Sequence, residues 1–135
     1  MAFADLPLVG MLKTRMRWLE SRQKILAENV ANANTPGYRE RDLRPLGFQE
    51  LVEGGSAAGV VKAAMTNPMH IPIQGSDDAR FGARRIKTFE TTPDGNSVVV
   101  EYQMMKVAEN QQDYQVATML YTKSLNLLKM AVKGV

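Results

Sequence analysis

The chain has 135 residues, of which 44% are hydrophobic, and it contains no cysteine and one histidine, His70. This length suits one domain, and the lack of cysteine excludes disulfides and thiolate metal sites. The net charge of +3 falls short of the clustered basic surface that nucleic-acid binding needs. No stretch is apolar enough to span the membrane or to form a Sec signal, and the residue types present predict no cofactor.

The first predicted element is a long amphipathic helix, from about residue 6 to about residue 33, with its N-cap at Asp5. Its apolar residues recur in alternating steps of three and four, which is the heptad pattern of a helix packed against another helix. Gln23 is the one polar member of this row and a candidate for fixing the register by a hydrogen bond. The row consists of Val9, Leu12, Met16, Leu19, Gln23, Leu26, Val30 and Ala33.

A second apolar row on this helix consists of Met11, Trp18 and Ile25. This row widens the apolar surface beyond a single coiled-coil seam. We therefore expect the helix to contact more than one partner helix.

The end of this helix is marked by a strong turn signal. Pro36 disfavours the helical conformation at Thr35, and Pro36 followed by Gly37 fits the central pair of a type II turn. Three asparagines precede the turn, and two interpretations of them stay open: capping of the helix end, where asparagine tolerates the left-handed conformation, or contact between subunits. They are Asn29, Asn32 and Asn34.

The middle of the chain, residues 39–97, holds most of the glycine and proline and has no sustained helical or strand period. We expect a long irregular loop region with a short helix near 48–53 and short extended pieces near 71–73 and 85–89. The sequence Thr-Pro-Asp-Gly-Asn at 92–96 predicts a turn.

The last predicted element is a helix that begins between about residues 97 and 101 and ends before Gly134. The β-branched valines before it favour an extended entry. A second heptad row runs along this helix, with Gln111 as its polar member. The row consists of Met104, Val107, Gln111, Tyr114, Thr118, Tyr121, Leu125, Leu128 and Val132, and the flanking apolar residues are Met105, Ala108, Met119, Leu120 and Leu127.

Together these elements predict a mostly α fold, in which the long N- and C-terminal helices form an antiparallel coiled-coil-like hairpin. We divide the chain into residues 1–38, the helix and its turn, residues 39–97, the loop region, and residues 98–135, the second helix. The first and last parts would form one core domain. Because one hairpin cannot bury two broad apolar faces, we expect neighbouring subunits to complete it, and repetition of such a unit gives an open helical filament.

The segment Asn29-Val-Ala-Asn-Ala-Asn-Thr-Pro-Gly-Tyr38 resembles the N-terminal signature of the bacterial flagellar axial proteins, which are the rod, hook and hook-associated proteins. Within this family the short chain, the segment Met65-Thr-Asn-Pro-Met-His-Ile71 and the turn Pro93-Asp-Gly-Asn-Ser97 are similar to those of proximal rod proteins. A rod protein of the FlgC type, which shares the N-terminal signature, is the alternative.

The resemblance implies a structural protein without enzymatic activity, whose terminal helices polymerise into a helical tube that surrounds the export channel and transmits torque from the MS-ring. It also implies unfolded export through the flagellar type III apparatus and assembly of the basal-body rod in the periplasm. The implied partners are other copies of the chain, other rod proteins (the FlgC, FlgF and FlgG types), the MS-ring protein FliF and the adaptor FliE.

Two sets of candidate site residues follow. Phe48 and Val52 match the Phe-x-x-x-aliphatic pattern of an export-gate motif, but we favour an amphipathic turn packed on the helices because such short patterns are common. The assembly interface is assigned to the two long helices. Its predicted residues are Leu12, Met16, Trp18, Leu19, Leu26, Asn29, Val30, Asn32, Val107, Tyr114, Tyr121, Leu125 and Leu128.

Two other classes of function can be compared with a rod subunit. A helical adaptor of a secretion apparatus would have the same composition, but it would form a small defined complex instead of an open assembly. An enzyme has little support, because the sequence contains no nucleophile, base and orienter set, no phosphate-binding glycine pattern and no metal cluster.

Overall fold

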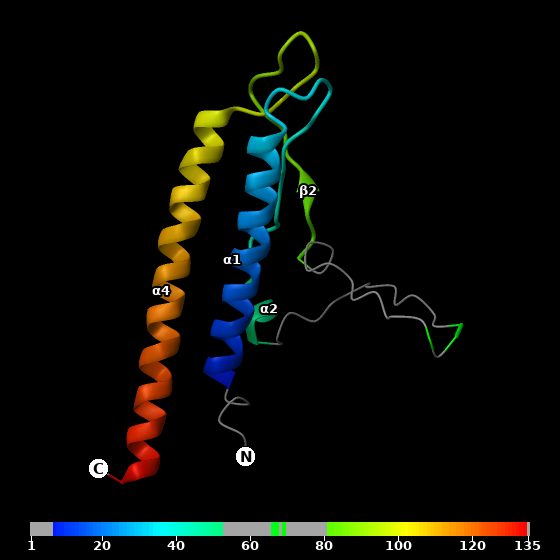
Figure 1. The fold of residues 1–135 in the computed structure, drawn as a ribbon. Coiled ribbons are helices and arrows are strands. Elements are labelled where there is room, and N and C mark those ends of the chain that lie inside the picture. Colours follow the sequence, from blue (N-terminus) through cyan, green and yellow to red (C-terminus); the bar gives the residue numbers. More distant parts are fainter. Residues whose placement is uncertain (1–6, 53–65, 68, 70–80, 135) are drawn as a thin grey trace.

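Two long helices, α1 (Pro7–Ala31) and α4 (Val100–Lys133), lie side by side as an antiparallel hairpin (Figure 1). This computed structural model describes residues 7–52, 66–67, 69 and 81–134. The predicted mostly α hairpin is therefore confirmed, whereas the predicted N-cap at Asp5 lies outside the described residues. Neither helix is long and apolar enough to cross a membrane.

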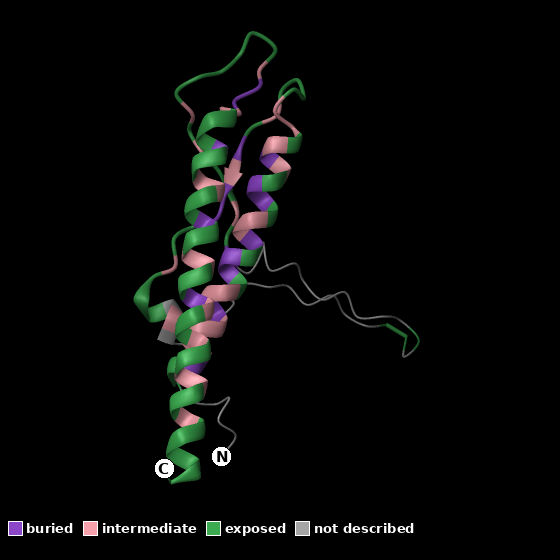
Figure 2. Ribbon diagram, turned by 60° about the vertical axis from the view of Figure 1, so that its left-hand side comes forward, coloured by how far each residue is buried: buried purple, intermediate pink, exposed green. Residues whose placement is uncertain are grey.

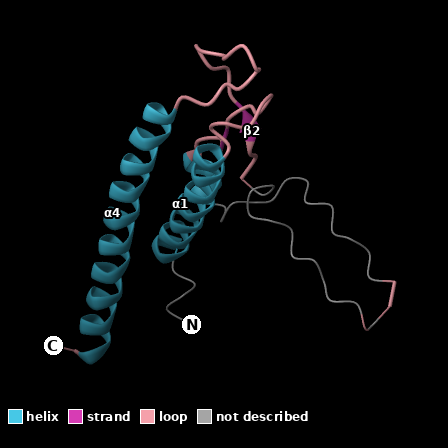
Figure 3. Ribbon diagram, turned by 45° about the horizontal axis from the view of Figure 1, so that its top comes forward, coloured by secondary structure: helices cyan, strands magenta, loops and turns pink. Residues whose placement is uncertain are grey.

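Among the described residues between the long helices there are three short elements: β1 (Arg41–Asp42), α2 (Phe48–Val52) and β2 (Arg84–Arg85). The two strands form a small antiparallel ladder (Figure 3). The predicted short helix is confirmed by α2. The extended piece predicted near 85–89 shares one residue with β2, and the piece near 71–73 lies outside the described residues.

The turn after α1 has the predicted geometry. The Tyr38 backbone N–H donates to the Thr35 carbonyl at 3.3 Å, and Gly37 has a φ of +72°, which the third position of a type II turn requires. No residue except glycine has a positive φ among the described residues, so neither Asn32 nor Asn34 adopts the left-handed conformation.

Two asparagine side chains bond instead to carbonyls at the end of α1 and just beyond it. Asn32 donates from Nδ2 to the Glu28 carbonyl at 2.8 Å, so capping is confirmed for this residue. Asn96, which belongs to the predicted turn at 92–96, donates from Nδ2 to the carbonyls of Asn32 and Thr35 at 2.9 and 2.7 Å. The two turns therefore hold each other at one end of the hairpin.

The entry and exit of α4 agree with the prediction. Val99 is extended, with φ −99° and ψ 107°, and the helix begins at the next residue. At the other end Gly134 takes the left-handed conformation, with φ 66°, which terminates the helix at Lys133.

Residues 38–46, which we call the return segment, run back along α1 and cover its second apolar row. Leu43 of this segment and Phe81 pack with Trp18 and Ile25 in the main buried cluster. The indole N–H of Trp18 also donates to the Arg44 carbonyl at 3.0 Å. An extended chain of the same molecule therefore covers part of this row, while α1 contacts two helices, α4 and α2, as the width of its apolar surface predicted.

The face of α4 that meets α1 also differs from the predicted row. Its buried residues are Gln103, Asn110 and Ala117, one heptad apart, whereas Met104 and Gln111 of the predicted row are exposed. Asn110 donates from Nδ2 to Gln23 Oε1 at 2.9 Å. Gln23 therefore bonds across the helices as predicted, but its partner is Asn110, and the prediction for Gln111 was wrong. A search for apolar residues cannot find a seam whose buried members are amides and alanine.

Replacing Ala117 with Leu should destabilise the fold by about 1–3 kcal/mol, because the larger side chain overpacks the seam. Ala108→Leu on the exposed side of α4 should change the free energy of unfolding by less than about 0.5 kcal/mol. Urea unfolding followed by circular dichroism measures both. Equal effects of the two variants would contradict the assignment of the seam.

Candidate assembly site

Asn29 is the centre of the signature segment, and its side chain joins three parts of the chain. Nδ2 donates to the Arg41 carbonyl at 2.7 Å and to Gln103 Oε1 at 3.0 Å. Oδ1 accepts from the Tyr38 hydroxyl and from the Arg41 backbone N–H, both at 3.1 Å. Since Asn29 is fully buried and all its hydrogen-bonding capacity is used, it links α1, the return segment and α4 within one molecule.

Two buried carboxylates of the return segment continue this network. Gln103 donates from Nε2 to Glu40, which is only 4% exposed. Asp42 accepts from Arg22 Nε and Nη2 at 3.1 and 3.3 Å, and Lys106 Nζ lies 3.5 Å from it. The return segment is thus fixed to both long helices by charge-assisted contacts.

The electrostatics of Glu40 differ from those of an exposed carboxylate. Burial raises its pKa, and the positive charge of Lys106 acts in the opposite direction. A carboxyl group with a higher pKa in the folded chain binds its proton more readily there than in the unfolded chain. The contribution of Glu40 to stability therefore falls as the pH rises from the ordinary pKa of 4.5 through the raised pKa.

The side of α4 that faces away from α1 carries a row of exposed residues, which we call the outer stripe (Figure 2). Its members recur in steps of three and four, and its six large apolar side chains are between 48% and 68% exposed. The sequence analysis predicted several of them only as flanking residues, because it placed the seam one residue too far toward the end of α4. The stripe consists of Tyr102, Met105, Glu109, Gln112, Val116, Leu120, Lys123, Leu127 and Met130.

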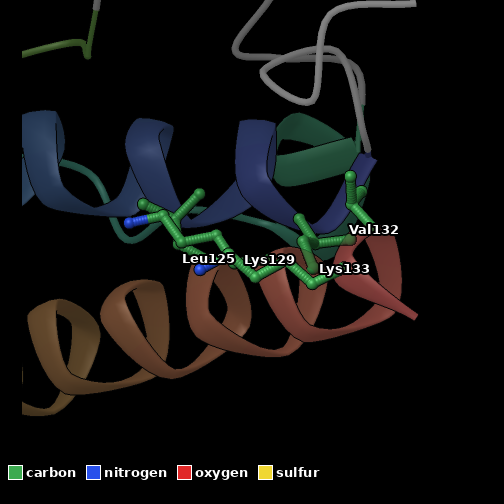
Figure 4. A pocket seen from close by; sticks show the side chains of 5 residues that line it. Leu125, Lys129, Val132 and Lys133 are labelled. Carbon is green, nitrogen blue, oxygen red and sulfur yellow. The ribbon is translucent and has the colours of Figure 1, made fainter. Parts of the chain in front are cut away.

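Two hollows adjoin this helix. An open groove of about 740 Å³ runs beside the outer stripe and includes Thr118, Met119 and Met130. A smaller apolar recess of about 220 Å³ lies near the end of α4, where Leu125 and Val132 are flanked by lysines (Figure 4). Both are surfaces that a second helix would fill.

The structure contains one chain and so does not test the predicted interface, whose residues remain predictions. None of the predicted residues lies on the outer stripe. Four are already buried in the single chain: Trp18, Leu19, Leu26 and Asn29. The others are half-buried: Leu12, Met16, Val30, Asn32, Val107, Tyr114, Tyr121, Leu125 and Leu128.

The second predicted site lies in α2. This helix contacts α1, but the Phe48 ring is 75% exposed, so the favoured interpretation, a turn whose apolar residues pack on the helices, was wrong for Phe48. Val52 is the last residue of α2.

No ligand set for a metal ion is found among the described residues: no group of three histidine, aspartate, glutamate or cysteine side chains comes together there. His70 lies outside those residues. The buried carboxylates Glu40 and Asp42 contact amide and basic groups instead, as described above.

Comparison with known proteins gives consistent matches. A family model described as flagella basal body rod protein matches residues 14–39, which include the signature segment. The chain is 33% identical over 115 residues to the flagellar basal body rod protein FlgB of Escherichia coli K12, covering 84% of this chain and 78% of that protein. It is 32% identical over 115 residues to FlgB of Cereibacter sphaeroides, covering 85% of each. It is also 30% identical over 118 residues to FlgB of Agrobacterium fabrum C58, covering 86% and 85%.

Replacing Asn29 with Ala should destabilise the fold by about 2–4 kcal/mol, because it leaves several buried polar groups without partners. Asn34→Ala, at an exposed position of the same turn, should change stability by less than about 0.5 kcal/mol. Urea unfolding of both variants checks this. A small loss for Asn29→Ala would mean that water replaces the amide.

Replacing Glu40 with Gln should stabilise the fold at pH 7 and have less effect at pH 4, because it removes a charge that is unfavourably buried above its raised pKa. The measurement is the difference in unfolding free energy between variant and wild type at each pH. The exposed substitution Glu90→Gln serves as the control. A variant that is less stable than wild type at pH 7 would show that attraction to Lys106 outweighs burial.

Proposed function

The chain belongs to the FlgB family of flagellar basal body rod proteins, and we propose that it forms the proximal rod by packing its outer stripe against neighbouring subunits. As a member of this family it is a structural subunit that assembles with other rod proteins in the flagellar basal body. Because these relatives are FlgB proteins, the FlgC-type and adaptor alternatives are not favoured.

The observation that carries the proposal is the difference between the two long helices. The wide apolar face of α1 is covered by the return segment and α4, so Trp18, Leu19 and Leu26 are buried in one molecule. In contrast, the outer stripe of α4 leaves six large apolar side chains exposed. Six large apolar side chains exposed along one side of a helix are typical of a surface that a partner covers.

The form of the assembly follows from the position of this surface. The outer stripe lies along one side of α4, so a neighbour can cover it with a different surface. Contacts between different surfaces, repeated from subunit to subunit, produce an open helix. We infer that the chain contributes to a helical tube around the export channel and transmits torque from the MS-ring.

Further partners are proposed on the family resemblance. They are other copies of this chain, rod proteins of the FlgC, FlgF and FlgG types, the MS-ring protein FliF and the adaptor FliE. We propose that the chain is exported unfolded by the flagellar export apparatus and assembles in the periplasm. The exposed ring of Phe48 is consistent with a role of that segment in recognition by the export gate. Since the family is structural, we propose no catalytic activity.

Replacing Leu120 with Asp should abolish swimming and remove the chain from isolated basal bodies, because a carboxylate is costly to bury unpaired at a subunit contact. The fold itself should be unaffected, since Leu120 is 48% exposed in the single chain. The variant gene would replace the native one, and urea unfolding of the purified variant would verify folding.

The matched control is Gln111→Asp, which adds the same charge at an exposed position of α4 outside the outer stripe. This variant should swim normally. Normal swimming of Leu120→Asp with incorporation into the rod would overturn the proposal, whereas loss of swimming in both variants would point to a general effect of charge on α4.

A further inference from the structure

The outer face of the small β1–β2 ladder is basic. Along the return segment Glu40 and Asp42 are buried. Arg39 and Arg41 alternate with them and are more accessible, so they lie on the other side of the extended chain. Arg85 is the partner of Arg41 across the ladder, and residues directly opposite each other project from the same side. Three arginines therefore gather on one face.

These three arginines line one hollow of about 550 Å³, which we call the basic hollow. Its other lining residues are Gly37 and Tyr38 of the signature segment. Like charges that face each other directly in an antiparallel ladder are unfavourable, so the pairing of Arg41 with Arg85 opposes the stability of the single chain. An anion bound in the hollow would turn this repulsion into attraction.

A carboxylate of the chain itself already binds one of the three arginines. Glu28 accepts through Oε2 from Arg41 Nη2 at 2.6 Å. In contrast, Arg39 and Arg85 form no ion pair and no side-chain hydrogen bond with another described residue. Since a guanidinium group binds a carboxylate through two parallel hydrogen bonds, these two arginines are available to an acidic partner.

We propose that the basic hollow binds an extended acidic segment of a different protein, whose two carboxylates, two residues apart, pair with Arg39 and Arg85. Diagonal neighbours in an antiparallel ladder lie about 7–8 Å apart. Alternate residues of an extended chain project from one side at a spacing of about 7 Å, so the two spacings match. This surface is separate from the outer stripe, and the inference adds to the proposed function a partner that is recognised by charge.

A second copy of this chain does not supply such a segment. The sequence contains one pair of acidic residues two positions apart, Glu40 and Asp42, and both are buried. An anionic lipid surface is also disfavoured. Glu28 neutralises one of the three arginines, which leaves less positive charge than the basic clusters that bind such surfaces.

Binding can be measured with a labelled peptide of alternating glutamate and threonine, added to the purified full chain at low ionic strength. Fluorescence anisotropy should show saturable binding that added salt weakens. Arg39→Gln and Arg85→Gln should each raise the Kd about tenfold, because each removes a pair of charge-assisted hydrogen bonds. The matched control is Arg84→Gln, which removes the same charge at an exposed position that does not line the hollow. It should raise the Kd by less than about twofold.

Charge reversal separates binding from folding. Arg85→Glu places a carboxylate directly opposite Arg41, so it should abolish peptide binding while raising the urea concentration at the midpoint of unfolding. An arginine that serves only the fold would give the reverse, a lower midpoint, and that result would overturn the proposal.

Three further results would also overturn it. The first is absence of saturable peptide binding, or an equal loss of binding in Arg84→Gln. The second is equal binding of a peptide whose glutamates are three residues apart, which would contradict the proposed spacing. The third is binding of the chain to phosphatidylglycerol vesicles through Arg39 and Arg85 without binding of the peptide, which would identify a lipid surface. The proposed rod function would stand in each case, because it depends on the outer stripe and is tested by Leu120→Asp.

Discussion

One fully buried amide, that of Asn29, determines how the three main segments lie together. Its two N–H groups and its oxygen bind the return segment and α4 from a fixed position on α1. The turn at Gly37, the path of the chain back along α1 and the axial position of α4 are therefore set by one side chain. A shift of any one segment would leave a buried donor or acceptor unpaired, which costs more than a normal hydrogen bond contributes.

The two sides of α4 serve different purposes, and their composition reflects this. The side that meets α1 has Gln103, Asn110 and Ala117 at its buried positions, so directional hydrogen bonds fix the position of α4. The opposite side carries six large apolar residues that are exposed in the single chain. Apolar contact is non-directional and grows with area, which suits association between subunits.

The sequence was sufficient for the elements that depend on local chemistry. Helix α1, the Pro36-Gly37 turn and the end of α4 at Gly134 follow from heptad spacing and from the backbone preferences of proline and glycine. The rotation of α4 was predicted incorrectly because Gln103 and Asn110 are buried, and a polar residue gives no signal in an apolar pattern. The return segment was missed for a similar reason, since its buried Glu40 and Asp42 are residue types that usually lie on the surface.

A seam held by amides also limits the stability of the single chain. A well-packed apolar seam would gain more from burial, because a hydrogen bond inside the protein mainly replaces one with water. A buried polar residue nevertheless fixes register, since a slip by one heptad would separate Asn110 from Gln23 and Asn29 from Gln103. For a subunit that we propose to pass unfolded through a channel and then to assemble, this combination is suitable. The hairpin needs a single register more than a large stability of its own. In the proposed assembly, packing between subunits supplies the remaining stability.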